Sequence, residues 1–344
     1  MNIIINGRFL IHKITGVERY AREIVLELDK LVKPGEIEMA VPPETREIPS
    51  YTNIRMVRIG RLHDRLWEHS SFPLYVKKKR GVSLNLCNVA PLCSPGIVCI
   101  HDVKIKARPQ DFSKKFLLWY NLLFMNETKR ARKIITVSEF SKKEIMKYYN
   151  VSPDRIDVIP NAWQHYKRIE YDEATLKKYK LEKGQYYFSI CSLEPNKNFK
   201  WIAEVAQKMP ESVFAIAGSI NKTVFSEGLD FNCSENMRLL GYVSDQEAKT
   251  LMRDCKAFLF PTFYEGFGIP PLEAISAGCE NVIVSDTEVM HEVLGESANY
   301  IDPYETKEGL PTRRIRNKDC LMRYSWEESA RKLMTVVRKI QRSQ

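Results

Sequence analysis

Short apolar runs and amphipathic stretches alternate along most of the chain. Runs such as residues 257–260 (AFLF) have the length and composition of buried strands, whereas residues 17–31 place apolar side chains at helical spacing. The expected strands are residues 2–6, 96–100, 133–137, 156–161, 186–192, 213–218, 237–243, 257–260 and 282–285. Strands that alternate with helices predict an α/β fold built from two doubly wound parallel sheets, which are Rossmann-like.

The length of the chain predicts the number of domains. A chain of 344 residues is too long for one ordinary domain and suits two of roughly 150 to 180 residues. Its hydrophobic content of 44% is sufficient for two cores. We therefore expect two α/β domains.

Residues 264–278 (YEGFGIPPLEAISAG) carry the clearest candidate chemistry. A glycine-bearing loop leads into a short helix, whose first positions suit the two prolines and whose end suits Gly278. The backbone N–H groups of Gly266, Phe267 and Gly268 lie at the start of this helix. Such a site can bind a phosphate, because glycines let an anion approach the backbone closely.

Glu265 and Glu273 bracket the phosphate-binding loop. A carboxylate accepts hydrogen bonds from two neighbouring hydroxyls, so the arrangement suits a phosphate with a sugar on either side, as in a nucleotide-sugar. Alternatively, the glycines form an ordinary turn and the glutamates are favourable charges near the helix N-terminus. The residue pattern alone leaves both interpretations open.

The segment EGFGIPPLEAISAG, with seven residues between Glu265 and Glu273, resembles the signature of the retaining glycosyltransferases of family four, which have the GT-B fold. Other segments extend the resemblance over most of the chain. The resemblance implies an acceptor-binding domain at residues 1–165, joined by a C-terminal helix at 326–344. It also implies a nucleotide-sugar-binding domain at residues 166–325, with the reaction in a central cleft between the two domains.

Two further loops carry the resemblance. Gly16, before the helix at 17–31, resembles the family's glycine loop that faces the donor diphosphate, although an ordinary helix cap also explains it. Tyr242 and Val243 belong to a GYVSD turn that lies near the nucleotide base in the family.

His101 follows a strand, at the sheet edge where α/β proteins bind ligands. The family's histidine at this position lies beside the transferred sugar, whereas a lone histidine would be structural.

Residues 193–198 (LEPNKN) resemble the family's strand-to-helix turn that carries a diphosphate-binding lysine, which corresponds to Lys197. Many relatives also carry an arginine on this turn. Here Ser192 and Asn196 stand at such places. Neutralisation of the diphosphate is therefore expected to rest mainly on Lys197.

The resemblance implies a role for each of these residues. Lys197 and the N–H groups of the glycine loop would hold the leaving diphosphate. Glu265 would contact the sugar, Glu273 the ribose hydroxyls, and His101 would orient the sugar, so His101 and Glu265 are the candidate catalytic residues. No residue stands out as a nucleophile, and in the family's favoured account the leaving phosphate accepts the acceptor proton on the same face.

The sequence predicts no metal and no cofactor apart from the donor substrate. Its eight cysteines are scattered without metal-ligand spacing. It also has no D-x-D motif, which is the usual metal-diphosphate clamp of the other major glycosyltransferase fold. We therefore expect metal-independent chemistry.

The net positive charge is concentrated in the first half of the chain. The net charge of +10 divides into +11 for residues 1–165 and −1 for the remainder. Such asymmetry suits nucleic acid, an anionic membrane surface or an anionic substrate, and no nucleic-acid-binding signature accompanies it. The basic, aromatic-bearing segment at 61–80 suits a membrane interface or a solvated helix end. We expect binding to a membrane surface or to a phosphorylated acceptor.

The chain shows neither a membrane-spanning run of about 20 apolar residues nor a signal peptide, which predicts a cytoplasmic protein, free or peripheral on the inner face of the plasma membrane. The expected function is transfer of a hexosyl group to a glycan acceptor, in particular a lipid-linked oligosaccharide, in surface-polysaccharide synthesis such as that of O-antigen lipopolysaccharide. The EGFGIPPLEA group favours GDP-mannose as donor. The alternatives are a nucleotide-sugar epimerase of GT-B fold and a catalytically silent nucleotide-binding homologue.

Overall fold

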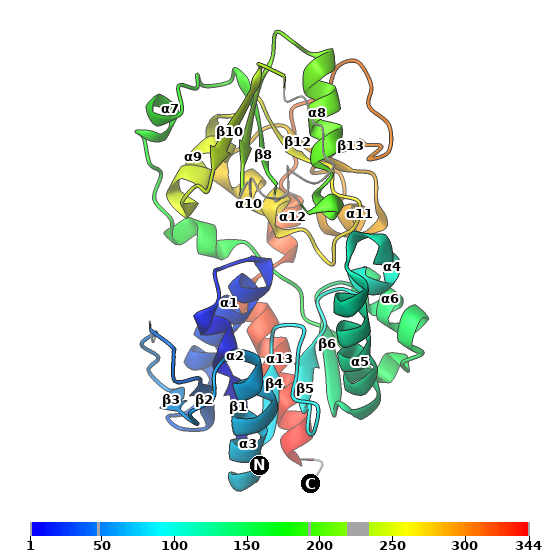
Figure 1. Cartoon of the computed structure of the whole chain (residues 1–344). Coiled ribbons are helices and arrows are strands. Elements are labelled where there is room, and N and C mark those ends of the chain that lie inside the picture. Colours follow the sequence, from blue (N-terminus) through cyan, green and yellow to red (C-terminus); the bar gives the residue numbers. More distant parts are fainter. Residues whose placement is uncertain (1, 47–48, 192–193, 219–233, 343–344) are drawn as a thin grey trace. The chain divides into compact units, whose positions relative to one another are not determined.

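The computed structural model describes residues 2–46, 49–191, 194–218 and 234–342. These residues form two α/β units, each built on a parallel sheet (Figure 1). The predicted fold class is thereby confirmed.

The chain divides into two compact units, Met1–Asn161 with Ser325–Gln344, and Ala162–Tyr324. The boundary after Asn161 lies slightly before the domain boundary after residue 165 that was expected from the sequence. It places His165 in the second unit, where this residue contributes to the candidate site described below.

The sheet of the first unit has the strand order β3-β2-β1-β4-β5-β6-β7, and every neighbouring pair is parallel. Its strands are β1 (Ile3–Asn6), β2 (Ile37–Val41), β3 (Arg55–Arg58), β4 (Val82–Asn85), β5 (Ile97–Cys99), β6 (Lys133–Thr136) and β7 (Ile156–Val158). Its helices are α1 (Gly16–Leu31), α2 (Asp64–Leu66), α3 (Phe72–Lys78), α4 (Lys104–Ala107), α5 (Lys114–Arg130), α6 (Glu139–Tyr149) and α13 (Trp326–Arg342).

The C-terminal helix α13 packs against α1 in the first unit (Figure 1). The indole ring of Trp326 meets the ring of Tyr20 edge-on, with centroids 6.0 Å apart. Ser329 Oγ donates to the Pro160 carbonyl oxygen at 2.8 Å. The C-terminal helix therefore completes the core of the first unit, although the whole second unit precedes it in the sequence.

Two of the three aromatic side chains of the segment at 61–80 belong to the core of the first unit. Trp67 and Phe72 are fully buried, with stacked rings 5.3 Å apart, and they share a hydrophobic cluster with Ile4 and Ala40. They are therefore unavailable to a membrane interface. The exposed apolar side chains of this segment are those of Leu62, Leu66 and Leu74.

The sheet of the second unit has the order β10-β9-β8-β11-β12-β13, again parallel. Its strands are β8 (Tyr186–Ile190), β9 (Val213–Ala217), β10 (Met237–Gly241), β11 (Ala257–Phe260), β12 (Val282–Ser285) and β13 (Asn299–Ile301). Its helices are α7 (Thr175–Lys178), α8 (Phe199–Lys208), α9 (Asp245–Asp254), α10 (Ile269–Ala277), α11 (Glu288–Leu294) and α12 (Asp319–Arg323).

Each sheet reverses its strand order once. In the first unit the reversal lies between β1 and β4, and in the second between β8 and β11. The loops that follow two such strands diverge, which leaves a crevice at the carboxyl ends of the strands where open α/β sheets bind ligands. The fold thus predicts one ligand site in each unit.

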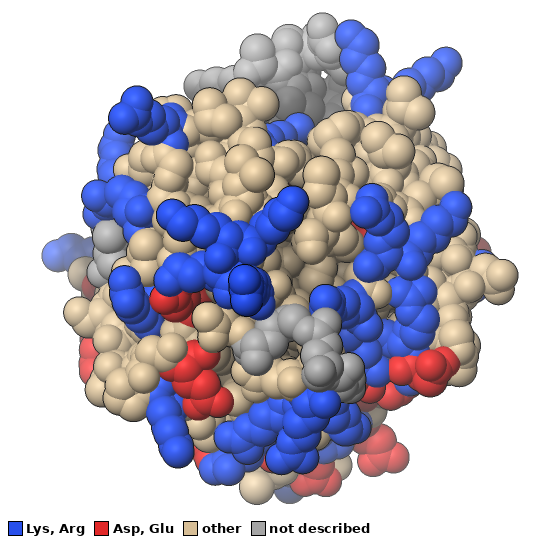
Figure 2. All heavy atoms as spheres, turned by 90° about the horizontal axis from the view of Figure 1, so that it is seen from below, with Lys and Arg blue, Asp and Glu red and all other residues tan. Residues whose placement is uncertain are grey.

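Basic side chains gather on the face shown in Figure 2. In Figure 1 this is the end of the first unit where α3 and α13 finish. Because α3 ends at Lys78 and β4 begins at Val82, the exposed residues Lys77, Lys78 and Arg80 lie at the amino edge of the first sheet. In the described part of the chain, none of the helices combines the length and the apolar composition that crossing a bilayer requires.

Candidate functional site

In the second unit, the loops after β8 and β11 bring Lys197 and Glu265 together. Lys197 ends a short helical turn, Pro195–Lys197, that precedes α8, and Glu265 lies in the loop between β11 and α10. Because β8 and β11 are hydrogen-bonded neighbours, these two loops meet at the reversal of the sheet. Lys197 Nζ lies 2.8 Å from Glu265 Oε1.

The Lys197–Glu265 pair is partly buried, with 25% and 17% of the side chains exposed. Burial by itself lowers the pKa of the Lys197 amine, but the charge of the Glu265 carboxylate and its hydrogen bond outweigh burial and raise that pKa. The amine therefore carries a positive charge at neutral pH. The site presents a fixed cation that is balanced by one carboxylate.

Asn196 joins the two loops. Its side-chain Nδ2 donates to the Tyr264 carbonyl oxygen at 2.7 Å, and its backbone carbonyl oxygen accepts from the Phe263 N–H at 3.0 Å. The side chain is buried, so it fixes the separation of Lys197 and Glu265. Ser192, the other position at which relatives carry an arginine, lies outside the described residues.

The glycine loop enters α10 through Gly268, which has a φ of +85°. This left-handed backbone conformation favours glycine, and a Cβ atom here would lie 2.4 Å from Met290 Cε, so the end of the methionine side chain would have to move. Phe267 is buried, with its ring edge-on to that of Tyr324 at 5.1 Å, so only its backbone can face a ligand. Gly266, the remaining member of the loop, is also buried.

Glu273 lies in the second turn of α10 and is held by a residue that the sequence did not indicate. His165 Nε2 lies 2.7 Å from Glu273 Oε1, and the His165 side chain is only 1% exposed. The contact orients the carboxylate through Oε1. Oε2 has no hydrogen-bond partner in the part of the chain that the structure describes, so it can accept a ligand hydroxyl.

Tyr242 and Val243 follow the edge strand β10. The Tyr242 side chain is 82% exposed and Val243 is half-buried. The next residue, Ser244, caps α9 through a capping box with Glu247. The turn is therefore fixed by its own helix cap while the tyrosine ring stays open to solvent.

In the first unit, His101 follows β5 and is almost completely buried. Its Nε2 lies 2.8 Å from the Leu86 carbonyl oxygen, so Nε2 carries the hydrogen. The ring of Tyr20 meets it edge-on at 4.9 Å. Burial lowers the pKa of His101, which keeps the imidazole neutral at physiological pH.

Gly16 is the exposed first residue of α1. Thr15 and Glu18 form a capping box around it, with the Thr15 N–H donating to Glu18 Oε2 at 3.2 Å. Its backbone thus follows an ordinary helix entrance. Thr15, Val17 and Glu18 nevertheless line the cavity of the first unit.

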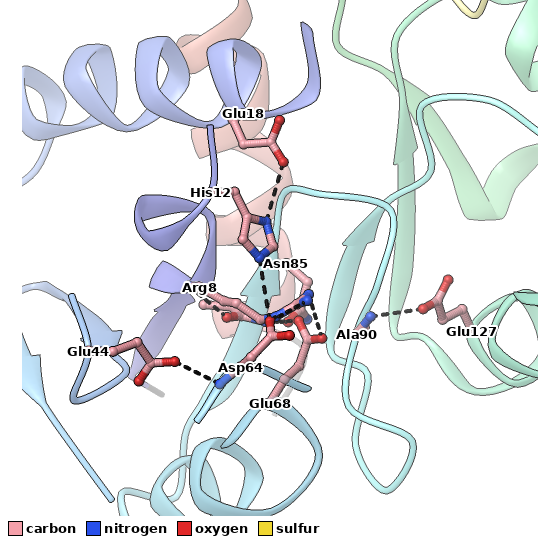
Figure 3. A network of polar contacts seen from close by, with 10 residues as sticks. Arg8, His12, Glu18, Glu44, Asp64, Glu68, Asn85, Ala90 and Glu127 are labelled. Atoms are coloured by element: carbon pink, nitrogen blue, oxygen red, sulfur yellow. Dashed lines mark hydrogen bonds and ion pairs between the residues drawn. The ribbon is translucent and has the colours of Figure 1, made fainter. Parts of the chain in front are cut away.

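This cavity of about 380 Å³ lies beside the reversal between β1 and β4. Arg8 is central to its polar wall, with NH2 2.7 Å from Asp64 Oδ1 and NH1 3.0 Å from Glu68 Oε2 (Figure 3). His12 lies between Glu18 and Asp64, at 3.5 Å and 3.4 Å. The sequence did not indicate the partners of Arg8, because they come from separate segments.

The opposite wall of the cavity rests on buried residues behind it. The wall includes Leu86, Cys87, Asn88 and Val89. His101 contacts it through the Leu86 carbonyl and, by its own N–H, through Asn88 Oδ1 at 2.7 Å. Glu127 Oε1 accepts from the Ala90 N–H at 2.8 Å (Figure 3). His101 itself does not line the cavity.

The described residues contain no group of three or more His, Cys, Asp and Glu side chains arranged to hold a metal ion. The candidate chemistry consists instead of charged side chains, backbone N–H groups and two carboxylates in the second unit. A polar cavity accompanies it in the first unit.

Two family models and several known proteins match this chain. The family model "Glycosyltransferase Family 4" matches residues 14–163, and "Glycosyl transferases group 1" matches residues 172–310. A similar protein is the O-antigen chain mannosyltransferase RfbU of Salmonella typhimurium, 28% identical over 288 residues that cover 78% of either chain. Another is O-antigen chain mannosyltransferase B of Escherichia coli, 29% identical over 60% of this chain and 57% of its own length.

Solved structures show the same fold at low identity. Sucrose-phosphate synthase from Thermosynechococcus elongatus superposes with a TM-score of 0.75 at 13% identity, covering 100% of this chain and 99% of its own. WaaG, a glycosyltransferase involved in lipopolysaccharide biosynthesis, superposes with a TM-score of 0.65 at 14% identity, covering 96% and 94%. With one family model on each part of the chain and this fold in both units, the chain belongs to the family-four glycosyltransferases of the GT-B fold.

Proposed function

We propose that this glycosyltransferase transfers a hexosyl group, mannosyl in particular, from a nucleoside-diphosphate sugar to a glycan acceptor with retention of configuration and without a metal ion. The observation that carries the proposal is the meeting of Lys197, Glu265 and the Gly268 loop at the reversal of the second sheet. A cation and backbone N–H groups suit a diphosphate, and the adjacent carboxylate suits a sugar hydroxyl.

The diphosphate of the donor would replace Glu265 as the partner of Lys197. Without donor, the two side chains neutralise each other at 2.8 Å. A bound diphosphate competes for the Lys197 amine, which frees Glu265 to accept hydroxyls of the sugar. The ribose hydroxyls of the same molecule would reach Oε2 of Glu273, while His165 keeps Oε1 in place. Tyr242 would offer its exposed ring to the base.

In the proposed reaction, the bond between C1 of the sugar and the phosphate oxygen breaks, and its electron pair stays on the leaving diphosphate. Lys197 and the loop N–H groups stabilise that charge, because they are in place before the bond breaks. The acceptor hydroxyl forms the new bond to C1 on the same face, and its proton passes to a leaving phosphate oxygen. Glu265 stabilises the positive character of the ring.

His101 would serve this reaction from the first unit as a neutral group. Its Nε2–H is committed to the Leu86 carbonyl, so Nδ1 is the ring atom left to accept a sugar hydroxyl. Gly16 and Val243 would contribute backbone contacts to the donor.

The printed names of relatives support the sugar and the pathway. RfbU and mannosyltransferase B are named as O-antigen chain mannosyltransferases. We therefore propose a GDP-mannose donor and a role in O-antigen or similar surface-polysaccharide synthesis. A relative from Campylobacter jejuni, 26% identical over 185 residues, is named as acting on a diphospho-undecaprenol compound. A lipid-linked oligosaccharide is accordingly the acceptor class that we propose.

A lipid-linked acceptor would bring the enzyme to the inner face of the plasma membrane. The basic face in Figure 2 supports electrostatic binding there, because each Lys or Arg near an anionic surface contributes about 1 kcal/mol. Vesicles with anionic lipid should retain the protein at low salt and release it at high salt. Failure to sediment with such vesicles at low salt would contradict this part of the proposal.

The transferase proposal is tested by nucleoside-diphosphate release from GDP-, UDP- and dTDP-sugars, with and without EDTA. We expect slow, acceptor-independent release from one donor, unaffected by EDTA and reduced on the order of 100-fold in Glu265→Gln. Glu280→Gln is the matched control, since Glu280 is an exposed carboxylate paired with Arg314 outside the site. Conversion of the donor without release would instead indicate an epimerase. Neither release nor thermal stabilisation by any donor would indicate a silent homologue.

A further inference from the structure

Two cysteines of the second unit lie within reach of each other. Cys255 ends α9 and Cys279 follows the last turn of α10, and their Sγ atoms are 3.6 Å apart. The two helices pack against each other (Figure 1). We infer that this pair is a modification site, at which a hydroperoxide converts the two thiols to a disulfide. The inference does not depend on the roles proposed for the donor-site residues.

The sheet places the two cysteines at matching positions. β11 and β12 are parallel neighbours in which Phe258 is paired with Val282, and each cysteine lies three residues before one of these paired positions. The Phe258 N–H donates to the Asn281 carbonyl oxygen at 2.9 Å, so the pairing already holds beside the cysteines. Neighbouring strands lie about 4.8 Å apart, and a disulfide joins Cα atoms roughly 4.4 to 6.8 Å apart. The spacing of the two strands therefore suits a disulfide.

The two thiols make weak contacts to the backbone. Cys255 Sγ lies 3.2 Å from the Met252 carbonyl oxygen, and Cys279 Sγ lies 3.3 Å from the Asn281 carbonyl oxygen. A thiol is a weak hydrogen-bond donor, so little is lost when these contacts break. Cys255 is half-buried and Cys279 is buried. An oxidant therefore reaches Cys255 first, and Cys279 lies directly behind it.

The oxidation takes two steps. The Cys255 thiolate attacks the terminal oxygen of a hydroperoxide, the O–O bond breaks, and the alkoxide leaves and takes up the thiol proton, which leaves a sulfenic acid on Cys255. The Cys279 sulfur then attacks the sulfenic sulfur, and the hydroxyl leaves as water with the Cys279 proton. The two sulfurs together lose two electrons, which reduce the O–O bond. Burial raises the pKa of the Cys255 thiol, so the first step should take minutes to hours at neutral pH.

The disulfide would close a loop that contains the segment at 264–278. This loop includes β11, the glycine loop and α10, and so carries both Glu265 and Glu273. A cross-link stabilises a protein chiefly by restricting its unfolded chain. The cysteines precede β11 and β12 at the amino ends of these strands, whereas Lys197 and Glu265 meet at the carboxyl ends. The bond should therefore stabilise the segment without displacing these side chains.

The test is oxidation of the full chain with hydrogen peroxide, followed by peptide mapping by mass spectrometry under non-reducing conditions. We expect the peptides that carry Cys255 and Cys279 to be joined, with a summed mass lower by two hydrogen atoms, and dithiothreitol to separate them. The thermal midpoint should rise on the order of 5 °C on oxidation and return on reduction. Free thiols at both positions after a treatment that oxidises the exposed Cys93, or sulfinic acid on Cys255 without a cross-link, would overturn the inference.

Variants separate this pair from the other cysteines. Cys255→Ser should abolish both the cross-link and the rise in thermal midpoint. Cys93→Ser, which removes an exposed thiol of the first unit, is the matched control and should retain both. A rise that persists in Cys255→Ser would assign the stabilisation to another pair of thiols and overturn the inference. The mapping of the wild type needs no variant, so the test holds even if Cys255→Ser lowers stability.

Hydrogen exchange locates the effect of the bond. Amides of residues 257–277 should exchange on the order of tenfold more slowly in the oxidised protein, because the closed loop opens less often. Amides of α13 in the first unit provide the internal control and should exchange equally in both states. Equal or faster exchange at 257–277 after oxidation would contradict the stabilisation of this segment.

Discussion

The two units place polar residues at the same point of the same topology but build them differently. In the second unit the polar groups come mostly from two loops, one of them the continuous stretch at 264–278, and one cation faces one carboxylate. In the first unit they come from residues near 6–18, 64–68, 86–89 and 120, where Arg8 and His12 are paired with carboxylates and Arg65 is exposed. The arrangement in the second unit suits an anion, whereas in the first unit Arg8 is committed to the carboxylates of its own wall.

The largest effect is expected from Glu265. The variant Glu265→Ala removes the carboxylate that contacts the sugar in the transition state and leaves Lys197 for the diphosphate. Turnover should fall on the order of 100-fold, while the dissociation constant for the donor changes by less than about threefold. Initial rates and calorimetric titration measure the two quantities. Equal turnover in this variant and the wild type would remove Glu265 from the mechanism.

A different pattern is expected from Glu273. Its carboxylate is assigned to the ribose hydroxyls, a contact made equally in the ground and transition states. Glu273→Ala should therefore weaken donor binding on the order of tenfold, with kcat at saturating donor nearly unchanged. A fall in kcat with an unchanged KM would contradict the assignment.

His165 should show a smaller effect of the same kind, because it acts through Glu273. We expect His165→Asn to raise the KM for donor several-fold without lowering kcat, since the carboxylate loses the contact that orients it. In the double variant with Glu273→Gln, the two changes should not add. Additive effects would show that His165 acts elsewhere.

The smallest effect is expected from Glu127, which supports the wall of the cavity in the first unit, and it is an effect on stability. Glu127 is completely buried, and burial raises its pKa well above the ordinary value. The folded state therefore keeps a proton that the unfolded state releases above its own pKa. The stability that Glu127 contributes is present at low pH and is lost as the pH rises toward the folded pKa.

The variant Glu127→Gln tests this difference. Glutamine mimics the protonated acid and can still accept from the Ala90 N–H, so the variant should match the wild type near pH 4 and have a higher thermal midpoint near pH 7.5. Glu144→Gln, which changes a carboxylate paired with Lys147 on α6, is the control. A lower midpoint for Glu127→Gln at both pH values would indicate that the ionised form is the native one.

Much of the fold could be predicted from the pattern because parallel strands buried on both faces are continuous apolar runs, as Ile3–Asn6 and Ala257–Phe260 are. The pattern missed β4, where the buried Ser83 and Asn85 interrupt the run; Asn85 Nδ2 donates to the Pro95 carbonyl oxygen at 2.7 Å instead. It also missed β2, β13 and the edge strand β3, in which Arg55 and Arg58 are exposed.

The candidate donor site could be predicted in large part because its residues share one short segment. Lys197 required the resemblance to a family, and His165 left no signal, since it lies 108 residues before its partner Glu273. The cavity network could not be predicted for the same reason: Arg8 and Glu68 meet only after β1 and the segment around α2 have packed together.

The most direct test of the division between the two sites is calorimetric titration of GDP, UDP and dTDP into the wild type, Glu273→Gln and Asp64→Asn. The account predicts that one nucleotide binds the wild type and Asp64→Asn with the same affinity and binds Glu273→Gln on the order of tenfold more weakly. Equal weakening in Asp64→Asn, or full affinity in Glu273→Gln, would contradict the placement of the donor on the second unit.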